Sequence, residues 1–84
     1  MSHQIFILPP AEKDGQKLSR EAYQRCRQAL LKLAFNPRPS GCKKLVGEEG
    51  YRIRAGDYRI LYRIDDTAKK IFIYRIKHRR EVYR

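Results

Sequence analysis

The hydrophobic positions of the chain repeat with two different periods, one before and one after residue 40. Residues 5–8 are apolar on both faces and stop at a pair of prolines, which predicts a short buried strand and then a proline-initiated helix. From Ser19, a favourable N-cap, apolar side chains recur at the spacing of one helical face as far as Ala34. Pro37 and Pro39 end this helix, because each removes a backbone donor and biases its predecessor out of the helical region.

Beyond residue 50 the apolar positions alternate, which is typical of strands. Gly56-Asp57 predicts a two-residue hairpin turn, because glycine supplies the positive φ that such turns require. If Ala55 faces Tyr58 across this turn, the register of the whole hairpin follows. Four arginines then share one face of the sheet, which we call the arginine face: Arg52, Arg54, Arg59 and Arg63. The opposite face is largely apolar and is the natural surface for the amphipathic helix to cover.

A further strand is predicted over residues 71–77, after a polar turn at residues 65–70. If the turn centres on Thr67-Ala68, the expected pairs are Arg63 with Phe72, Leu61 with Tyr74 and Arg59 with Ile76. His78 then continues on the arginine face, whereas a slip of one residue sends it to the helix side. In the first register, Phe72 and Tyr74 stand beside arginines, a combination that suits unpaired RNA bases and phosphates.

The order of elements predicts an α+β fold in one small domain over residues 1–84. We expect an N-terminal strand and a two-helix hairpin packed on an antiparallel meander. A chain of this length buries only roughly 60 to 65% of its unfolded surface, so the core is small.

The charge balance points to an anionic partner. Twenty Lys and Arg against nine Asp and Glu leave a net charge of +11 in 84 residues, and this self-repulsion is useful only to a protein that binds anions. Nucleic acid is the leading candidate. No apolar run approaches the roughly 18 residues of a membrane span, and the polar first residues lack the basic region of a signal peptide. We therefore expect a cytoplasmic protein that does not enter a membrane.

The cysteines and histidines do not predict a metal site. Cys26 and Cys42 lie far apart, and the two histidines, His3 and His78, stand at opposite ends of the chain. Cys26 falls on the apolar helix face and is expected to be a reduced core thiol. We expect no metal and no cofactor. His78 is the one side chain near the basic tail that can exchange a proton near neutral pH.

Four blocks of the sequence resemble the RelE toxins of the RelE/ParE superfamily, in the same order and at similar spacing. They are residues 36–39 (NPRP), 41–45 (GCKKL), 51–62 (YRIRAGDYRILY) and 78–84 (HRREVYR). The resemblance covers nearly the whole chain. It implies a type II toxin that enters the ribosomal A site and cuts the bound mRNA without a metal. In such enzymes the 2′-hydroxyl of the message attacks the adjacent phosphate, leaving a 2′,3′-cyclic phosphate and a 5′-hydroxyl.

The resemblance also implies which residues form the site. The family positions map onto Arg52, Arg54, Arg59, Arg79 and Tyr83, and the first two are often lysines in the family. Because arginine does not give up its proton near neutral pH, proton transfer would shift to His78 and Tyr83. The expected catalytic residues are therefore His78, Arg59, Arg79 and Tyr83. The expected RNA-binding residues are Arg52, Arg54, Arg63, Lys43 and Lys44.

The partners implied by the resemblance are a cognate antitoxin, the ribosome and mRNA. The toxin–antitoxin complex is expected to be a higher-order hetero-oligomer that binds operator DNA. Two other functions stay open: a ParE-like toxin that acts on DNA gyrase without cutting RNA, and a non-catalytic RNA-binding module. Fold alone does not separate the two kinds of toxin, but the cluster of His78, Arg79 and Tyr83 beside a basic sheet favours the endonuclease over a gyrase inhibitor. Only the proton-transfer candidates argue against a plain RNA-binding module.

Overall fold

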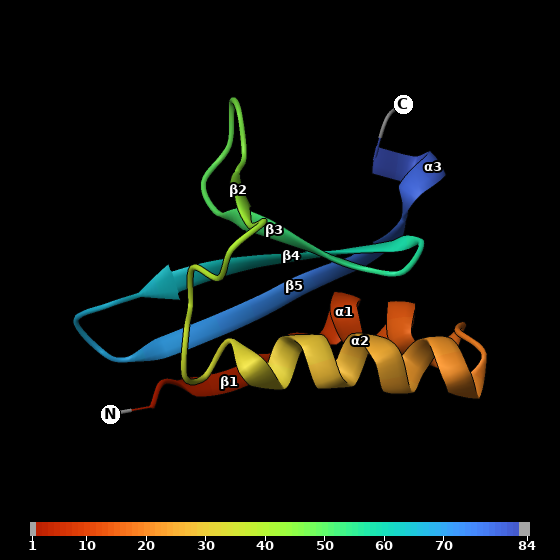
Figure 1. Ribbon diagram of the computed structural model, residues 1–84, viewed down its shortest axis with the longest axis horizontal. Coiled ribbons are helices and arrows are strands. Elements are labelled where there is room, and N and C mark those ends of the chain that lie inside the picture. The colour runs from red at the N-terminus through yellow and green to blue at the C-terminus, as the bar shows by residue number, and fades with distance from the viewer. Residues whose placement is uncertain (1, 83–84) are drawn as a thin grey trace.

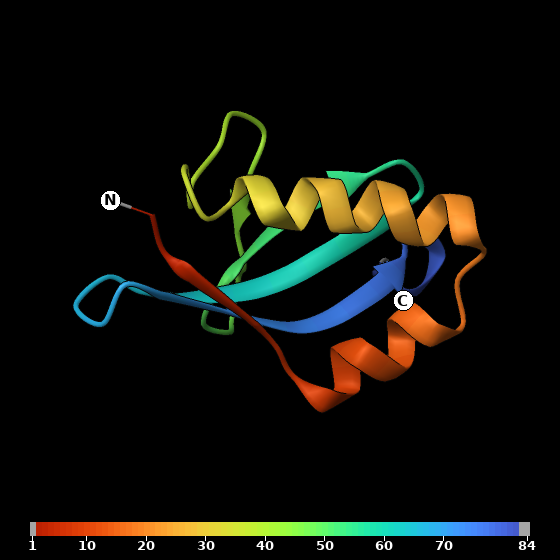
Figure 2. The ribbon, with the colours of Figure 1, turned by 90° about the horizontal axis from the view of Figure 1, so that it is seen from below.

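The computed structural model describes residues 2–82 of the chain. Its elements in chain order are β1 (Gln4–Ile7), α1 (Pro9–Gln16), α2 (Arg20–Lys32), β2 (Lys43–Lys44), β3 (Tyr51–Ala55), β4 (Tyr58–Asp65), β5 (Lys70–His78) and α3 (Arg79–Val82). The five strands form one sheet in the order β1-β5-β4-β3-β2, and α1 and α2 cover one side of it (Figures 1 and 2). The α+β class is confirmed.

Helix α2 begins and packs as its pattern predicts. The Ser19 hydroxyl oxygen accepts a hydrogen bond from the Ala22 amide at 3.2 Å, which confirms the N-cap. Cys26 and Leu30 are buried against the sheet, and Cys26 is a free thiol whose pKa is raised by burial. Among residues 2–82, no helix is long and apolar enough to span a lipid bilayer.

Strand β1 differs from its prediction in both pairing and burial. It runs parallel to β5 and lies at the edge of the sheet, so the sheet is mixed and the meander covers only its remaining strands. Phe6 and Ile7 are 39% and 37% exposed, so the prediction of a buried strand was wrong. Apolar residues on both faces of a strand do not reveal that one of its edges is open to solvent.

The β3–β4 hairpin has the predicted register. Gly56 adopts a φ of 63° in the turn, and Ala55 pairs with Tyr58. The pairing continues without a shift to Tyr51 and Tyr62, whose rings stack with centroids 6.0 Å apart. The arginine face is therefore confirmed as a feature of β3 and β4.

The pairing of β5 with β4 changes register in the middle of the strand. Arg63 pairs with Phe72 as predicted, but Leu61 pairs with Arg75, so a β-bulge leaves Tyr74 as the extra residue. The predicted pairs of Leu61 with Tyr74 and Arg59 with Ile76 were wrong. The shift keeps the isoleucines of β5 on the helix side, where they are buried.

The bulged part of β5 is held by a carboxylate from α1. Asp14 accepts hydrogen bonds from the Arg75 side chain at 2.7 and 3.2 Å and from the Ile76 amide at 2.8 Å. Partial burial alone would raise the pKa of Asp14. The hydrogen bonds from Arg75 and Ile76, with the charges of Arg75 and Lys17, outweigh burial and lower this pKa. Asp14 therefore ties α1 to β5 as a carboxylate.

We expect Asp14→Asn to lower the free energy of unfolding by about 1–3 kcal/mol at neutral pH, because it weakens charge-assisted hydrogen bonds to partly buried donors. Folding lowers the pKa of Asp14. The stabilisation that this carboxylate gives the fold is therefore fully present above its unfolded pKa of about 4, and is lost as the pH falls through its folded pKa. The difference between parent and variant should therefore shrink on acidification, as measured by urea unfolding across pH.

Glu12→Gln provides the matched control for this variant, because it removes the same charge from the exposed side of α1. It should leave the stability nearly unchanged. An Asp14→Asn protein as stable as the parent at neutral pH would contradict the structural role of this carboxylate.

Candidate nucleic-acid interface

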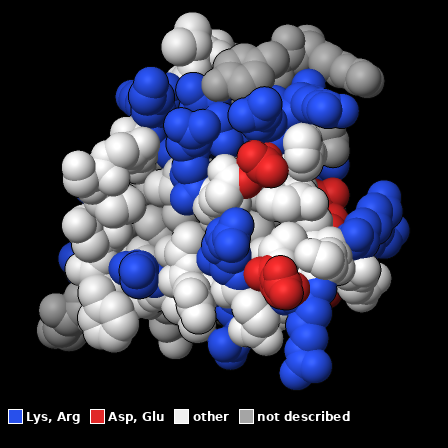
Figure 3. Space-filling view, turned by 45° about the vertical axis from the view of Figure 1, so that its right-hand side comes forward, with Lys and Arg blue, Asp and Glu red and all other residues white. Residues whose placement is uncertain are grey.

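The arginine face lies on the side of the sheet that α1 and α2 leave open. Figure 3 shows Lys and Arg side chains gathered along the upper part of the molecule, on the side opposite these helices in Figure 1. In register, Arg59 on the central strand β4 lies between Arg54 on β3 and Lys77 on β5. Directly opposed residues have Cβ atoms about 5 Å apart. Three cationic side chains therefore form a row across three strands.

A second pair of cations lies at the β2 edge of this face. Lys43 pairs with Arg52, so the lysine stands on the same side of the sheet as the arginines. The sequence pattern does not predict strand β2, because a strand of two residues is too short to show an alternation of polar and apolar side chains. The loop between β2 and β3 and helix α3 both project from this side of the sheet, so they flank the arginine face (Figure 1).

A small cavity of about 80 Å³ opens among these side chains. It is lined by Gly41, Lys43, Arg52, Ile53, Arg54 and Arg59. Arg59 is only 3% exposed and forms its inner part, whereas Arg54 is exposed. None of the described residues that line the cavity carries a carboxylate. The cavity is well below the several hundred Å³ of a typical ligand pocket, but it suits a single phosphate group, which guanidinium groups bind through paired hydrogen bonds.

Aromatic rings continue the arginine face towards the β1 edge. The Phe6 and Phe72 rings stack with centroids 5.6 Å apart, and Arg63 is the cross-strand partner of Phe72. The Arg63 guanidinium lies over the Tyr74 ring, 5.5 Å from its centroid. The predicted neighbourhood of Phe72 and Tyr74 with an arginine is confirmed, and Tyr74 reaches it through the bulge.

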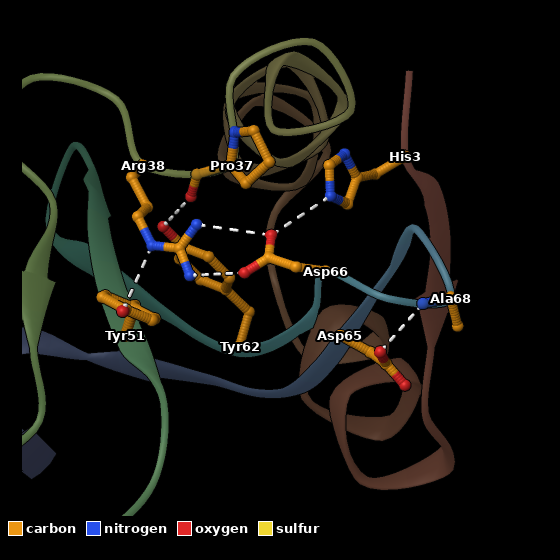
Figure 4. Close-up of polar contacts among 8 residues, drawn as sticks. All are labelled: His3, Pro37, Arg38, Tyr51, Tyr62, Asp65, Asp66 and Ala68. Atoms are coloured by element: carbon orange, nitrogen blue, oxygen red, sulfur yellow. Dashed lines mark hydrogen bonds and ion pairs between the residues drawn. The ribbon is translucent and has the colours of Figure 1, made fainter. Parts of the chain in front are cut away.

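The loop that leads to Lys43 is fixed to the sheet by one arginine (Figure 4). Within residues 36–41, Arg38 donates hydrogen bonds to both carboxylate oxygens of Asp66, at 3.0 and 3.4 Å, and to the Tyr51 hydroxyl at 3.2 Å. The bonds from Arg38 lower the pKa of Asp66. This bidentate contact joins the loop to β3 and to the turn after β4, and so holds β2 in place.

A buried tyrosine makes the second attachment of this loop. The Tyr62 hydroxyl donates to the Pro37 carbonyl at 2.7 Å, and burial, together with the neighbouring Cys42, raises the pKa of Tyr62, so the phenol keeps its proton. The buried His3 ring approaches the same cluster, with Nε2 3.6 Å from an Asp66 carboxylate oxygen (Figure 4). These contacts position the β2 end of the interface from the opposite side of the sheet.

His78 does not join the arginine face. The bulge turns it to the helix side, where it pairs with Tyr58 and its ring meets the tyrosine edge-on at 5.3 Å. Its Nδ1 accepts a hydrogen bond from the Arg80 amide at 3.3 Å, so the neutral ring carries its proton on Nε2. The prediction that His78 stands among the arginines was wrong, because it assumed regular alternation along β5.

No group of three or more His, Cys, Asp or Glu side chains gathers to hold a metal ion within the part of the chain that the structure describes.

The sequence family described as "ParE toxin of type II toxin-antitoxin system, parDE" matches residues 5–83 of this chain. The chain belongs to the RelE/ParE superfamily of toxins. It is thus the toxin component of a type II toxin–antitoxin system. Toxin RelG of Mycobacterium tuberculosis is 47% identical over 34 residues, a stretch that covers 40% of this chain and 39% of that relative. This chain therefore matches less than half of RelG.

Solved structures agree with this membership over the whole fold. RelE in the archaeal RelE–RelB complex from Pyrococcus horikoshii superposes with a TM-score of 0.81 at 30% identity, over 94% of this chain and 97% of that one. A variant of the Escherichia coli toxin RelE in the free state superposes with a TM-score of 0.78 at 25% sequence identity, over 99% of this chain and 92% of that one. A chain of the toxin–antitoxin complex RelBE2 of Mycobacterium tuberculosis superposes with a TM-score of 0.68 at 28% sequence identity, over 93% of this chain and 99% of that one.

In this RelE/ParE toxin the predicted site residues fall into separate places. Those that the structure brings together on one side of the sheet are Lys43, Arg52, Arg54, Arg59 and Arg63. Lys44 is exposed on β2 and pairs with Tyr51, so its register points it to the other side. Arg79 begins α3 with an exposed side chain, and its amide donates to the Asp57 carbonyl at 2.7 Å. Tyr83 lies outside the described residues.

Lys77 also lies on the arginine face, as the partner of Arg59, and it was not among the site residues predicted from the sequence. A signal for it is present in the chain. The isoleucines of β5 at 71 and 73 are two residues apart, but the next follows three residues later, at 76. A change of spacing from two to three within an apolar series is what a bulge requires. A bulge at this point places Lys77, and not His78, beside Arg59.

We expect inorganic phosphate to bind the cavity and stabilise the toxin, because the ligand engages charges that only the folded chain brings together. Phosphate at ten times its dissociation constant should raise the free energy of unfolding by about 1.4 kcal/mol. Thermal unfolding in phosphate and in chloride of equal ionic strength measures this. Arg54→Ala should reduce the effect, and Arg27→Ala on α2 should retain it. Equal stabilisation of both variants would contradict a specific site.

Proposed function

We propose that this toxin is a ribosome-dependent mRNA endonuclease, which acts in the cytoplasm and cuts the message in the A site without a metal. The 2′-hydroxyl of the message attacks the adjacent phosphate, and cleavage leaves a 2′,3′-cyclic phosphate and a 5′-hydroxyl. The observation that carries the proposal is the cavity of phosphate size, which is lined by Lys43, Arg52, Arg54 and Arg59. A scissile phosphate seated there would meet only cationic and neutral lining residues.

Each arginine has a role in this proposal that follows from its position. Arg59, buried at the inner end of the cavity, and Arg79, exposed at the start of α3, bind the scissile phosphate and stabilise the charge that develops on its oxygens. Arg52 and Arg54 hold the scissile phosphate and the neighbouring phosphates of the RNA. Tyr83 keeps the role of orienting the reacting groups as an expectation from the family resemblance.

The aromatic end of the arginine face suits the bases that flank the cut. Arg63 lies over the Tyr74 ring and is paired with Phe72, which supplies a flat surface and a cation together. Stacking of unpaired bases on such rings contributes about 1–3 kcal/mol per base. Basic and aromatic side chains in alternation are typical of surfaces that bind single-stranded RNA.

The composition of the cavity supports dependence on the ribosome. The described residues that line it include no carboxylate or imidazole that could serve as a general base. Such a site gains most from a substrate held in a reactive geometry, since orientation alone can supply about 7–11 kcal/mol of a reaction barrier. A message threaded through the ribosome is held in this way.

Purified toxin should therefore cut a defined message during cell-free translation and leave the same naked RNA nearly intact. Primer extension locates the cut, and end-group analysis should find the cyclic phosphate and the 5′-hydroxyl. A chelator should not change the rate once the ribosomes are shown to be whole. Efficient cutting of the free RNA at the same positions would refute the dependence on the ribosome.

A second function is supported by the family match, because the matching family carries the ParE name. ParE-like toxins act on DNA gyrase and do not cut RNA. The same experiment separates the two functions when a gyrase supercoiling reaction is run beside it. Inhibition of supercoiling with intact message would favour gyrase, and cutting with unaffected supercoiling would favour the endonuclease.

We propose that the antitoxin docks in a groove on the helix side of the sheet. The groove lies between α1 and α2, has a volume of about 580 Å³ and includes the apolar side chains of Ile7, Leu18, Tyr23 and Leu30. Arg20 and Arg27 also line it, so an amphipathic segment with acidic flanks suits it. RelE is bound to RelB in the structures from Pyrococcus horikoshii and Methanococcus jannaschii. A corresponding antitoxin helix is the proposed occupant here.

Ile7→Arg should weaken binding of the antitoxin encoded beside this toxin by about tenfold or more, because it places a charge in an apolar groove and forfeits buried apolar area. Calorimetry on the purified proteins measures the affinity. Phe35→Arg is the matched control, since Phe35 is 82% exposed after the end of α2 and does not line the groove. If Ile7→Arg bound as tightly as this control, the antitoxin would dock elsewhere.

A further inference from the structure

A hollow of about 610 Å³ lies at the end of the arginine face, where the chain turns from β4 into β5. This volume is within the range of a typical ligand pocket. The hollow shares no lining residue with the phosphate cavity, and Arg63 follows Arg59 by four residues on β4, about 13 Å along the strand. Its lining includes a guanidinium, an aromatic ring, a hydroxyl and three carboxylates, which belong to Arg63, Phe72, Thr67, Glu49, Asp65 and Asp66.

Two of these carboxylates are engaged within the protein (Figure 4). Asp66 accepts hydrogen bonds from the Arg38 guanidinium, and Asp65 accepts one from the Ala68 amide at 3.0 Å. Glu49 differs from both, because it is exposed on the loop before β3. Its carboxylate is open to a ligand that enters the hollow.

The end of this loop holds Glu49 close to Arg63. Gly50, the next residue, has a φ of 121°, and a Cβ atom added to it would lie 2.7 Å from the Tyr62 carbonyl oxygen and 3.3 Å from Cγ of Arg63. The backbone therefore packs directly against β4, as only glycine allows. The Arg63 guanidinium rests over the Tyr74 ring. A carboxylate and a guanidinium thus line the hollow as neighbours.

We propose that this hollow binds a guanine base of RNA, an inference that rests on the RNA binding of the proposed function but not on cleavage. The carboxylates repel a phosphate group, so the hollow suits an uncharged group with N–H donors. Guanine presents two donors, N1–H and the N2 amine, on one edge, and two acceptors, O6 and N7, on the adjoining edge. Glu49 can accept from both donors while Arg63 donates to both acceptors.

The other three bases do not match this pair of side chains. Adenine and cytosine each carry one exocyclic amine next to a ring acceptor, and that acceptor would oppose the second oxygen of the Glu49 carboxylate. Uracil carries a single N–H between two carbonyl oxygens. A polar group that loses water without gaining a partner weakens binding, so each of these bases would bind less tightly than guanine.

Short single-stranded RNAs test the preference on the purified toxin. The strand is a run of uridines with one central guanosine, and its 2′-oxygens are methylated so that it cannot be cut. It should bind about tenfold more tightly than the same strand with a central adenosine or uridine, since one bidentate contact discriminates by about this factor. Fluorescence anisotropy at fixed ionic strength measures the affinities.

Two altered bases assign the contacts to their side chains. Inosine lacks the N2 amine, and 7-deazaguanine lacks the N7 acceptor. Glu49→Ala should bind the guanine and inosine strands equally and still prefer guanine to 7-deazaguanine, whereas Arg63→Ala should show the reverse. Glu48→Ala is the matched control, because Glu48 precedes Glu49 on the same exposed loop and does not line the hollow. This control should keep both preferences.

Cleavage on programmed ribosomes identifies the source of the base, with one message that has guanines near the cut and another that has inosine in their place. If the base belongs to the message, Glu49→Ala should slow cleavage of the guanine message alone. If it belongs to ribosomal RNA, the variant should slow both messages equally. Parental rates on both messages would show that the toxin does not use the hollow on the ribosome, and would overturn the proposal.

The binding assay also has outcomes that refute the site. A parent toxin that binds the guanine, inosine and adenosine strands equally has no guanine site. Full retention of the preference for guanine over inosine by Glu49→Ala would equally exclude the proposed contact. Neither result bears on the endonuclease function, because the parent toxin is tested for that function separately, by cutting of a message on ribosomes.

Discussion

Burial of three isoleucines on one side of β5 is the constraint on which the functional side of this protein depends. Ile71, Ile73 and Ile76 all belong to the core, yet a regular strand cannot place residues two and then three apart on one face. Exposing one isoleucine would cost about 2 kcal/mol, more than the roughly 1 kcal/mol of a lost ladder hydrogen bond. The bulge at Tyr74 therefore has the lower free-energy cost, and it determines which side chains lie beside Arg59.

Helix α1 stabilises that solution from outside the sheet. Strand β1 pairs with β5 only as far as Ile73, so beyond that point an edge of β5 needs another acceptor. Asp14 fills this position by accepting from the Ile76 amide and the Arg75 guanidinium together. A carboxylate on the helix side thus fixes the strand that carries Lys77 on the other side. The packing of α1 and the geometry of the arginine face are therefore parts of one arrangement.

Features of this structure that are set by residues close together in the chain can be predicted from the sequence, whereas features set by distant residues cannot. The β3–β4 register follows from the turn at Gly56, so the arginine face was predictable from adjacent residues. The pairing of β1 with β5 joins positions more than sixty residues apart, and no residue pattern near either strand predicts it. The bulge lies between these extremes. Its spacing signal is local, but it identifies a bulge only when all three isoleucines are known to share one core.

The two proposed binding surfaces lie on opposite sides of the sheet, and this separation constrains neutralisation of the toxin. Like charges directly opposite one another destabilise a sheet, so the row of Arg54, Arg59 and Lys77 weakens the free toxin and favours any anion that covers it. A helix confined to the groove between α1 and α2 would leave that row open. An antitoxin that both docks in the groove and blocks RNA must therefore continue past an edge of the sheet, with acidic residues in the segment that reaches the arginine face.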